Sequence, residues 1–279
     1  MREPKLLIAT GGKGVGKTYT TCKVIGDYIR SDTSIGKEGR KVLIFDVNEE
    51  YDNYELKKNK HTFEPKLLSV KDLPKYSVQK QPEVRRILPR DEKGNLLNLD
   101  GMIDMLNTIL HYYRGGLLVV EDINRYMTDT KSQEIIGTMA TNRHRDLDIY
   151  IHLQSLSPVT TRMWQNCACV RFHKQVDDVG RYKNRLPIAE MYFLAQMLVN
   201  IQYKINERFY CYVDNEKSKI YGKFSKRSFM IACYNYLMAH PKEIAKYKQR
   251  FGSGMDSYNK SVAFAINELV SKYYGNNEE

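Results

Sequence analysis

The stretch Gly11-Gly12-Lys13-Gly14-Val15-Gly16-Lys17-Thr18 decides how the amino-terminal part of this chain folds. It fits the spacing G-x-x-x-x-G-K-[ST] of a phosphate-binding loop, which joins a strand to a helix. The apolar run 6–9 predicts a buried strand before it, and residues 19–30 predict a helix after it. The alternative, a glycine-rich turn that holds a lysine by chance, does not explain these two flanking elements.

Glycines let backbone N–H groups curl around phosphates at the positive end of the following helix. The side chain of Lys17 would reach the β- and γ-phosphates, and the hydroxyl of Thr18 would hold Mg²⁺. We therefore expect ATP and Mg²⁺ as cofactors. The nucleotide-binding residues predicted in this way are Gly11, Gly12, Lys13, Gly14, Val15, Gly16, Lys17, Thr18 and Tyr19.

A pair of acids follows the apolar run 117–120, which predicts another buried strand. In such a site one carboxylate holds Mg²⁺, and a second orients the attacking water. By position Glu121 is the metal-side acid, with Thr18, and Asp122 is the water-side acid. Aspartate is one methylene shorter than the glutamate common at this place, so the reach of Asp122 to the water stays open. A solvated strand end is the alternative interpretation of the pair.

Gln154 and two arginines complete the predicted catalytic set. Gln154 ends the strand expected over 149–153, where an amide senses the γ-phosphate or positions water; a glutamine at the edge of the core is the alternative. Arg143 and Arg145 precede that strand. A guanidinium there would stabilise charge on the transferred phosphate, within the subunit or across an interface. The alternative is a surface arginine at a helix carboxyl terminus. His144 and His152 lack paired ligands and are expected to be structural.

Strand-like and helix-like runs alternate along the chain, which predicts an α/β fold with a mostly parallel central sheet flanked by helices. Further strands are expected over 41–46, 83–88 and 167–173, helices over 99–113 and 130–145, and an irregular excursion over 49–82. After residue 185 the pattern changes to a helix (188–205), a hairpin (208–213 and 219–224) and two or three helices up to 274. We thus expect an ATPase core over 1–185 and a basic hairpin and helical subdomain over 186–279.

Composition limits the cellular setting. None of the apolar runs in the 279 residues reaches the 18–20 residues of a membrane span, and the amino terminus leads directly into the first strand, which argues against a signal peptide. The five cysteines are an odd and scattered set without metal spacing. Reduced cysteines and a cytoplasmic location are therefore expected.

Positive charge is concentrated in the last third of the chain. The net charge is +11, and residues 181–279 hold 16 Lys and Arg against 9 Asp and Glu. This excess suits a polyanion such as nucleic acid. Two groups are candidates for contacts with DNA phosphates: Lys242, Lys246 and Arg250, which repeat every four residues, and Lys223, Lys226 and Arg227. A solvated helix face is the alternative for both groups.

Four motifs in order resemble those of the FtsK–HerA superfamily of DNA-pumping ATPases, over about residues 4–175. They are the phosphate-binding loop, Phe45-Asp46-Val47-Asn48-Glu49-Glu50-Tyr51, Val119-Val120-Glu121-Asp122-Ile123-Asn124-Arg125-Tyr126, and Asn142-Arg143-His144-Arg145 leading to Leu153-Gln154-Ser155. Two positions depart from the pattern: Glu49 stands where the family often has glycine, and Asp122 where it often has glutamate.

The resemblance implies a homo-oligomeric ring, usually a hexamer, in which ATP hydrolysis drives double-stranded DNA through the centre. The short chain and its compact carboxyl-terminal appendage are most similar to the viral genome-packaging branch, which implies the host cytoplasm and a capsid vertex or portal protein as partner. One alternative is a phage virion-assembly ATPase resembling zonula occludens toxin, which commonly carries a membrane segment. Another is a small-molecule or nucleotide kinase, against which the acid pair and Gln154 argue.

Overall fold

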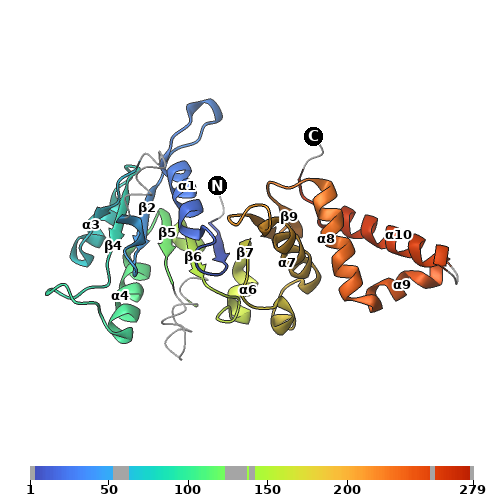
Figure 1. Cartoon of the computed structure of the whole chain (residues 1–279). Coiled ribbons are helices and arrows are strands. Elements are labelled where there is room, and N and C mark those ends of the chain that lie inside the picture. The colour runs from blue at the N-terminus through green and yellow to red at the C-terminus, as the bar shows by residue number, and fades with distance from the viewer. Residues whose placement is uncertain (1–3, 53–62, 123–136, 138–141, 252–254, 277–279) are drawn as a thin grey trace. The chain divides into compact units, whose positions relative to one another are not determined.

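The computed structural model describes residues 4–52, 63–122, 137, 142–251 and 255–276. The chain forms two compact units, Met1–Cys167 and Ala168–Glu279 (Figure 1). The domain boundary predicted between residues 185 and 186 stays a prediction. Because each unit has its own core, each is described by itself.

The first unit is built on a parallel sheet. Its strands are β1 (Leu6–Thr10), β2 (Lys41–Phe45), β3 (Lys66–Leu67), β4 (Val84–Ile87), β5 (Gly116–Val120) and β6 (Leu147–Leu153), in the spatial order β3-β4-β2-β5-β6-β1. Each described pair of these six strands is parallel. Parallel strands bring their carboxyl ends to one edge of the sheet, so the residues that follow β1, β2, β5 and β6 share that edge.

Short and long helices connect these strands. They are α1 (Lys17–Ile29), α3 (Leu73–Val78), α4 (Leu99–Tyr112) and α6 (Thr161–Asn166), with 3₁₀ turns η1 (Thr33–Ile35), η2 (Glu50–Asp52), η3 (Val70–Asp72) and η5 (Asn142–Arg145). The helix predicted over 130–145 falls largely outside the described residues, and its last four residues form η5.

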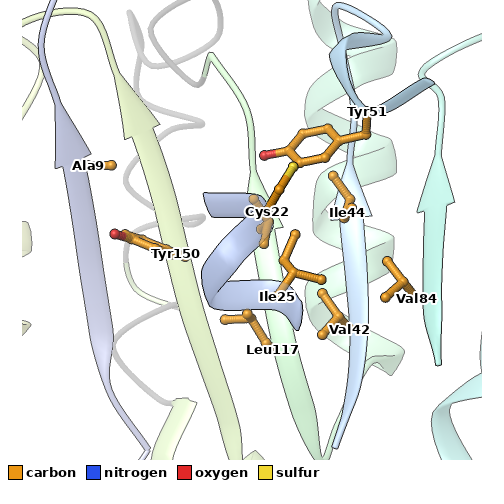
Figure 2. Packing of buried hydrophobic residues seen from close by; sticks show 10 residues of the cluster. Ala9, Cys22, Ile25, Val42, Ile44, Tyr51, Val84, Leu117 and Tyr150 are labelled. Atoms are coloured by element: carbon orange, nitrogen blue, oxygen red, sulfur yellow. The ribbon is translucent and has the colours of Figure 1, made fainter. Parts of the chain in front are cut away.

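Apolar side chains from both the helices and the sheet form the core of this unit. Figure 2 shows Cys22 and Ile25 of α1 against Val42 and Ile44 of β2 and Leu117 of β5. Side chains alternate between the faces of a strand, and the intervening β2 residues 43 and 45 are also fully buried. Both faces of the sheet are therefore covered, which explains why its strands read as continuous apolar runs.

Helix α3 corrects the prediction of an irregular excursion over residues 49–82. Its carboxyl-terminal carbonyls are bound by the buried side chain of Lys41, whose Nζ donates to Tyr76 O at 3.2 Å, to Gln79 O at 2.8 Å and to Ser77 O. The ammonium also lies 5.6 and 5.5 Å from the ring centroids of Tyr76 and Tyr113. The short helix is thus held by tertiary contacts, and its own six residues carry little helical signal.

The second unit contains an antiparallel ribbon and helices. Its elements are β7 (Cys167–His173), η6 (Val179–Tyr182), α7 (Ala189–Tyr203), β8 (Tyr210–Asp214), β9 (Lys219–Tyr221), α8 (Lys226–Ala239), α9 (Pro241–Phe251) and α10 (Met255–Tyr273). Strand β8 pairs antiparallel with both β7 and β9. The predicted fold class, a P-loop NTPase α/β fold with a mostly parallel sheet and a carboxyl-terminal hairpin and helices, is confirmed. Among the described helices, none combines the length and the apolar character that crossing a membrane requires.

Candidate nucleotide-binding site

The loop between β1 and α1 has the backbone form that phosphate binding requires. Gly14 and Gly16 adopt left-handed conformations, with φ of 77° and 85°, which a residue with a Cβ atom rarely adopts. Gly16 precedes α1, and neither a side-chain cap nor an acidic residue lies at the start of this helix. The first N–H groups of a helix have no partner within the helix. They are thus directed at whatever anion the loop holds.

The side chain of Lys17 lies within the curve of this loop. Its Nζ donates to Gly11 O at 2.6 Å and to Gly12 O at 2.7 Å. The Gly11 N–H in turn donates to Leu153 O at 3.3 Å, which ties the loop to the end of β6. Of the other loop residues predicted from the sequence, Val15 is buried, Lys13 and Gly14 are exposed, and Tyr19 is half-buried.

Glu121 is the more enclosed of the two acids that follow β5. Only 4% of its surface is exposed, and its Oε1 accepts a hydrogen bond from the Tyr51 hydroxyl and lies 2.8 Å from His152 Nδ1. Burial acts to raise the pKa of this carboxyl. The nearby His152, the Tyr51 hydroxyl and the charge of Lys17 act in the opposite direction, and the net shift lowers the pKa. Glu121 is therefore an ionised carboxylate inside the protein.

His152 was expected to be structural, and the structure places it beside the acid pair. Its ring is 1% exposed, and its Nε2 lies 2.7 Å from the Thr21 hydroxyl of α1. The imidazole therefore links the helix that follows the phosphate-binding loop to Glu121. The signal that could have indicated this contact is a histidine one position before the end of the predicted strand 149–153, among apolar and aromatic residues.

Asp122 lies where three strands end. Both of its carboxylate oxygens accept from Gln154 Nε2, at 2.8 and 3.1 Å, and Oδ2 also accepts from Asn48 Nδ2 at 3.1 Å. Its φ of 48° is left-handed, which turns the side chain away from the strand direction. The structure thus brings together Asp122 and Gln154, which the sequence predicts as catalytic, and adds Asn48 to them.

The loop after β2 contributes residues that belong to a motif quoted above but for which the sequence predicted no role in the site. The carboxylate of Asp46 accepts from the backbone N–H of Glu50 at 3.0 Å and of Tyr51 at 3.4 Å, which closes a tight turn. Burial raises the pKa of Asp46 to about 6. From this turn the Glu50 carboxylate accepts a hydrogen bond from the hydroxyl of Thr18. In the sequence, the Asp-x-x-x-Glu-Tyr motif at 46–51 is the one signal that this loop belongs to the site.

The donor set around Thr18 fits Mg²⁺ bound together with a nucleotide. The part of the chain described by the structure contains no group of three or more His, Cys, Asp or Glu side chains able to hold a metal ion. Mg²⁺ needs no such cage, because it is commonly bound by one or two oxygen side chains, substrate phosphates and water. The Thr18 hydroxyl and the Glu50 carboxylate that accepts its proton supply oxygen atoms of that kind.

The two candidate arginines lie at the edge of the sheet where the parallel strands begin, opposite the edge that holds the phosphate-binding loop. Arg145 belongs to η5, directly before β6, and its backbone carbonyl accepts from Gly115 N, before β5, at 3.0 Å. Burial and the nearby Arg114 lower the pKa of Arg145. The seven residues of β6 separate it from Gln154, a length of roughly 20 Å. This exceeds the reach of a side chain, so a role for Arg145 at the phosphate of its own subunit does not fit. Arg143 is in the same turn, and its side chain lies outside the described part.

The candidate DNA-binding residues form two groups in the second unit. Lys223, Lys226 and Arg227 are exposed around the start of α8. Lys242 and Lys246 are exposed on α9, where Lys246 pairs with Glu243, and the side chain of Arg250 lies outside the described part. The 14 residues of α8 put roughly 20 Å between the groups. They are therefore two separate basic surfaces.

Comparison with known proteins shows a shared fold. No family model matches the chain, and no curated protein matches its sequence. The genome packaging NTPase B204 from Sulfolobus turreted icosahedral virus 2 in complex with ATP-gammaS is similar over 79% of this chain and 97% of that chain, with a TM-score of 0.51 and 13% identity. Its complex with sulfate gives a TM-score of 0.50 at 13% identity, over 79% of this chain and 96% of that chain.

A weaker match is the N-terminal domain of zonular occludens toxin from Neisseria meningitidis. The TM-score is 0.35 and the identity 12%, over 61% of this chain and 76% of that chain. A score this low carries no argument about function. At 12–13% identity, these likenesses are likenesses of fold.

Proposed function

We propose that this chain is an ATP-driven motor that moves double-stranded DNA, as a viral genome-packaging ATPase does. The proposal depends on the contact between Asp122 and Gln154, two hydrogen bonds of 2.8 and 3.1 Å. The contact lies at the same edge of the sheet as the phosphate-binding loop, which the Gly11 N–H ties to Leu153 O of β6. An acid with an amide beside it holds and activates water, which hydrolysis requires. A kinase would instead need a second substrate at this place.

Each residue has a role in this proposal. The N–H groups of the loop and Lys17 hold the phosphates, while Asp122, held by Gln154 and Asn48, takes the position of the water-orienting acid. Mg²⁺, when bound at Thr18, would neutralise charge on the phosphates. Arg143 and Arg145, at the far edge of the sheet, would act on the nucleotide of a neighbouring subunit in a homo-oligomeric ring, which we propose to be a hexamer.

DNA binding is supported by the charge of the second unit. Lys226 and Arg227 lie in the first turn of α8, where cations are unfavourable next to the positive end of a helix. A phosphate bound between them would relieve that repulsion. Contacts of this kind hold the DNA backbone without reading its sequence. A capsid vertex or portal protein would be the further partner, with the host cytoplasm as the location.

The test is the rate of phosphate release from ATP at fixed salt, with double-stranded DNA, single-stranded DNA, heparin as a DNA-free polyanion, and no addition. Lys17→Ala serves as the inactive control. Stimulation by double-stranded DNA well above that by heparin supports the proposal. Equal rates in all four conditions overturn it and favour a virion-assembly ATPase that acts on protein. Transfer of phosphate to an added nucleoside monophosphate overturns it in favour of a kinase.

A further inference from the structure

The loop after β2 contacts both the metal side and the water side of the candidate site. Asn48 Nδ2 donates to Asp122 at 3.1 Å, and two residues later the Glu50 carboxylate accepts from the hydroxyl of Thr18. Neither the phosphate-binding loop nor the acid pair includes Glu50. Its contact is nevertheless with the residue expected to hold Mg²⁺, so its role needs an explanation.

The backbone of Glu50 is fixed from both sides. On one side, Asp46 accepts its N–H at 3.0 Å, and Asp46 is itself held by Arg86 Nη1 at 3.4 Å. On the other side, the ring of Tyr51 is buried in the apolar cluster near Cys22 and Ile44, as Figure 2 shows. The exposed Glu50 carboxylate therefore starts from a rigid turn, and its direction toward Thr18 is set by the fold.

Glu121 occupies the position expected for the metal-side acid, and the charge of Lys17 acts on its carboxylate. Its Oε1 meets the Tyr51 hydroxyl and His152 Nδ1, both of them buried groups. Thr18, in contrast, donates to Glu50. A threonine hydroxyl has one proton to donate and two lone pairs. When a carboxylate accepts the proton, the lone pairs are left for a cation.

We propose that Glu50 is a positioning residue for Mg²⁺: its carboxylate accepts the Thr18 proton and thereby turns the Thr18 oxygen toward the ion. The proposal rests on the proposed function, because it requires a nucleotide and Mg²⁺ at this loop. The loop after β2 is then a third segment that contributes residues to the site, in addition to the phosphate-binding loop and the acid pair. Loss of a residue that hydrogen-bonds to a metal ligand typically weakens metal affinity about 10- to 100-fold.

The experiment measures metal affinity directly, with the full chain and without turnover. Mn²⁺ replaces Mg²⁺ and is titrated against the protein with a non-hydrolysable ATP analogue, and bound Mn²⁺ is followed by electron paramagnetic resonance. Glu50→Gln should raise the Kd for Mn²⁺ about 10-fold or more. Its affinity for the analogue in EDTA, where no metal is bound, should stay within about two-fold of wild type, because its only described contact in the site is with Thr18.

Glu49→Gln is the matched control. It makes the same chemical change one residue away, in a carboxylate that pairs with Arg90 and not with Thr18. Its Mn²⁺ affinity should equal that of wild type. If Glu50→Gln behaves like Glu49→Gln, Glu50 does not position the ion, although the proposed function stands. If the wild-type chain binds no nucleotide at all, both proposals are overturned.

A double-mutant cycle separates positioning from a general charge effect. Glu50→Gln is introduced into the wild type and into a Thr18→Ala background, and the Kd for Mn²⁺ is measured for all four proteins. If Glu50 acts through Thr18, Glu50→Gln should change the Kd for Mn²⁺ little in the Thr18→Ala background, where the hydroxyl is absent. If the two effects instead multiply, Glu50 acts independently of Thr18, and the proposed arrangement is wrong.

Discussion

At the residue scale, the candidate site depends on where the side chains of three strand ends point. Asp122 is directed to Gln154 and Asn48, whereas Glu121, one residue before it, points to the buried Tyr51 and His152. Neighbouring positions on a strand face opposite sides of the sheet. The left-handed φ of 48° at Asp122 alters this geometry at the strand end. Two adjacent acids thereby have different surroundings, which suits two different roles.

Asp122→Asn tests the water-side role. Asparagine tolerates the left-handed backbone as aspartate does, so the change removes charge and leaves the turn intact. We expect the hydrolysis rate to fall by about 10²–10⁴-fold and the affinity for a fluorescent ATP analogue to stay within a few-fold. Unchanged turnover would assign the water-orienting role to another acid.

Glu49 offers a stability prediction, because its φ is 55°. A left-handed conformation costs a residue with a Cβ atom roughly 1–2 kcal/mol relative to glycine. Glu49→Gly and Glu49→Ala both remove the exposed ion pair with Arg90, and only the glycine removes the strain. We therefore expect the glycine variant to be more stable than the alanine variant by about 1 kcal/mol, measured by urea unfolding. Equal stability of the two variants would show that this turn is not strained.

At the element scale, the sequence predicts the sheet well and its short connections poorly. Strands β1, β2, β5 and β6 lie within two residues of their predicted bounds, because buried parallel strands are continuous apolar runs. Helix α3 was missed because it is six residues long, contains Pro74, and depends on the distant Lys41. Glu50 is part of the motif at 45–51, but the sequence predicted no role for it. Its contact with Thr18 follows from the turn that Asp46 closes, and residue spacing does not contain that information.

The link between Lys41 and α3 predicts a pH dependence of stability. Burial, with a contribution from Arg40, lowers the pKa of Lys41 from 10.5 to about 8. Between these values the unfolded chain binds more protons than the folded one, so the free energy of unfolding contributed by Lys41 rises with pH. The stability of wild type relative to Lys41→Met should therefore increase from pH 8 to pH 10, measured by chemical unfolding. A constant difference would mean that the three carbonyls and two rings keep Lys41 charged throughout.

At the scale of the whole molecule, the proposed motor needs subunits that complete one another. Arg145 lies at the edge of the sheet opposite the phosphate-binding loop, so the role we propose for it is at the nucleotide of a neighbouring subunit. The two basic surfaces on α8 and α9 are likewise separate in one chain. In a ring, repetition of such surfaces would line a path for DNA.

Mixing subunits tests the proposed role of Arg145. Arg145→Ala subunits added to wild type should lower the DNA-stimulated hydrolysis rate by more than their share of the mixture, because each variant disables the site of its neighbour. The matched control is Arg114→Ala, which removes the other guanidinium near this turn. A rate that falls in simple proportion to the variant fraction would show that Arg145 does not act across an interface.

Movement along double-stranded DNA can be followed by the displacement of a third strand from a DNA triplex. A short third strand is bound to a long duplex, and its release is followed over time with the wild-type chain and ATP, with a non-hydrolysable analogue, and with Lys17→Ala. If the chain moves DNA, release of the third strand requires ATP hydrolysis and a free stretch of duplex beside the triplex. Hydrolysis at full rate with no release of the third strand would contradict the proposed movement.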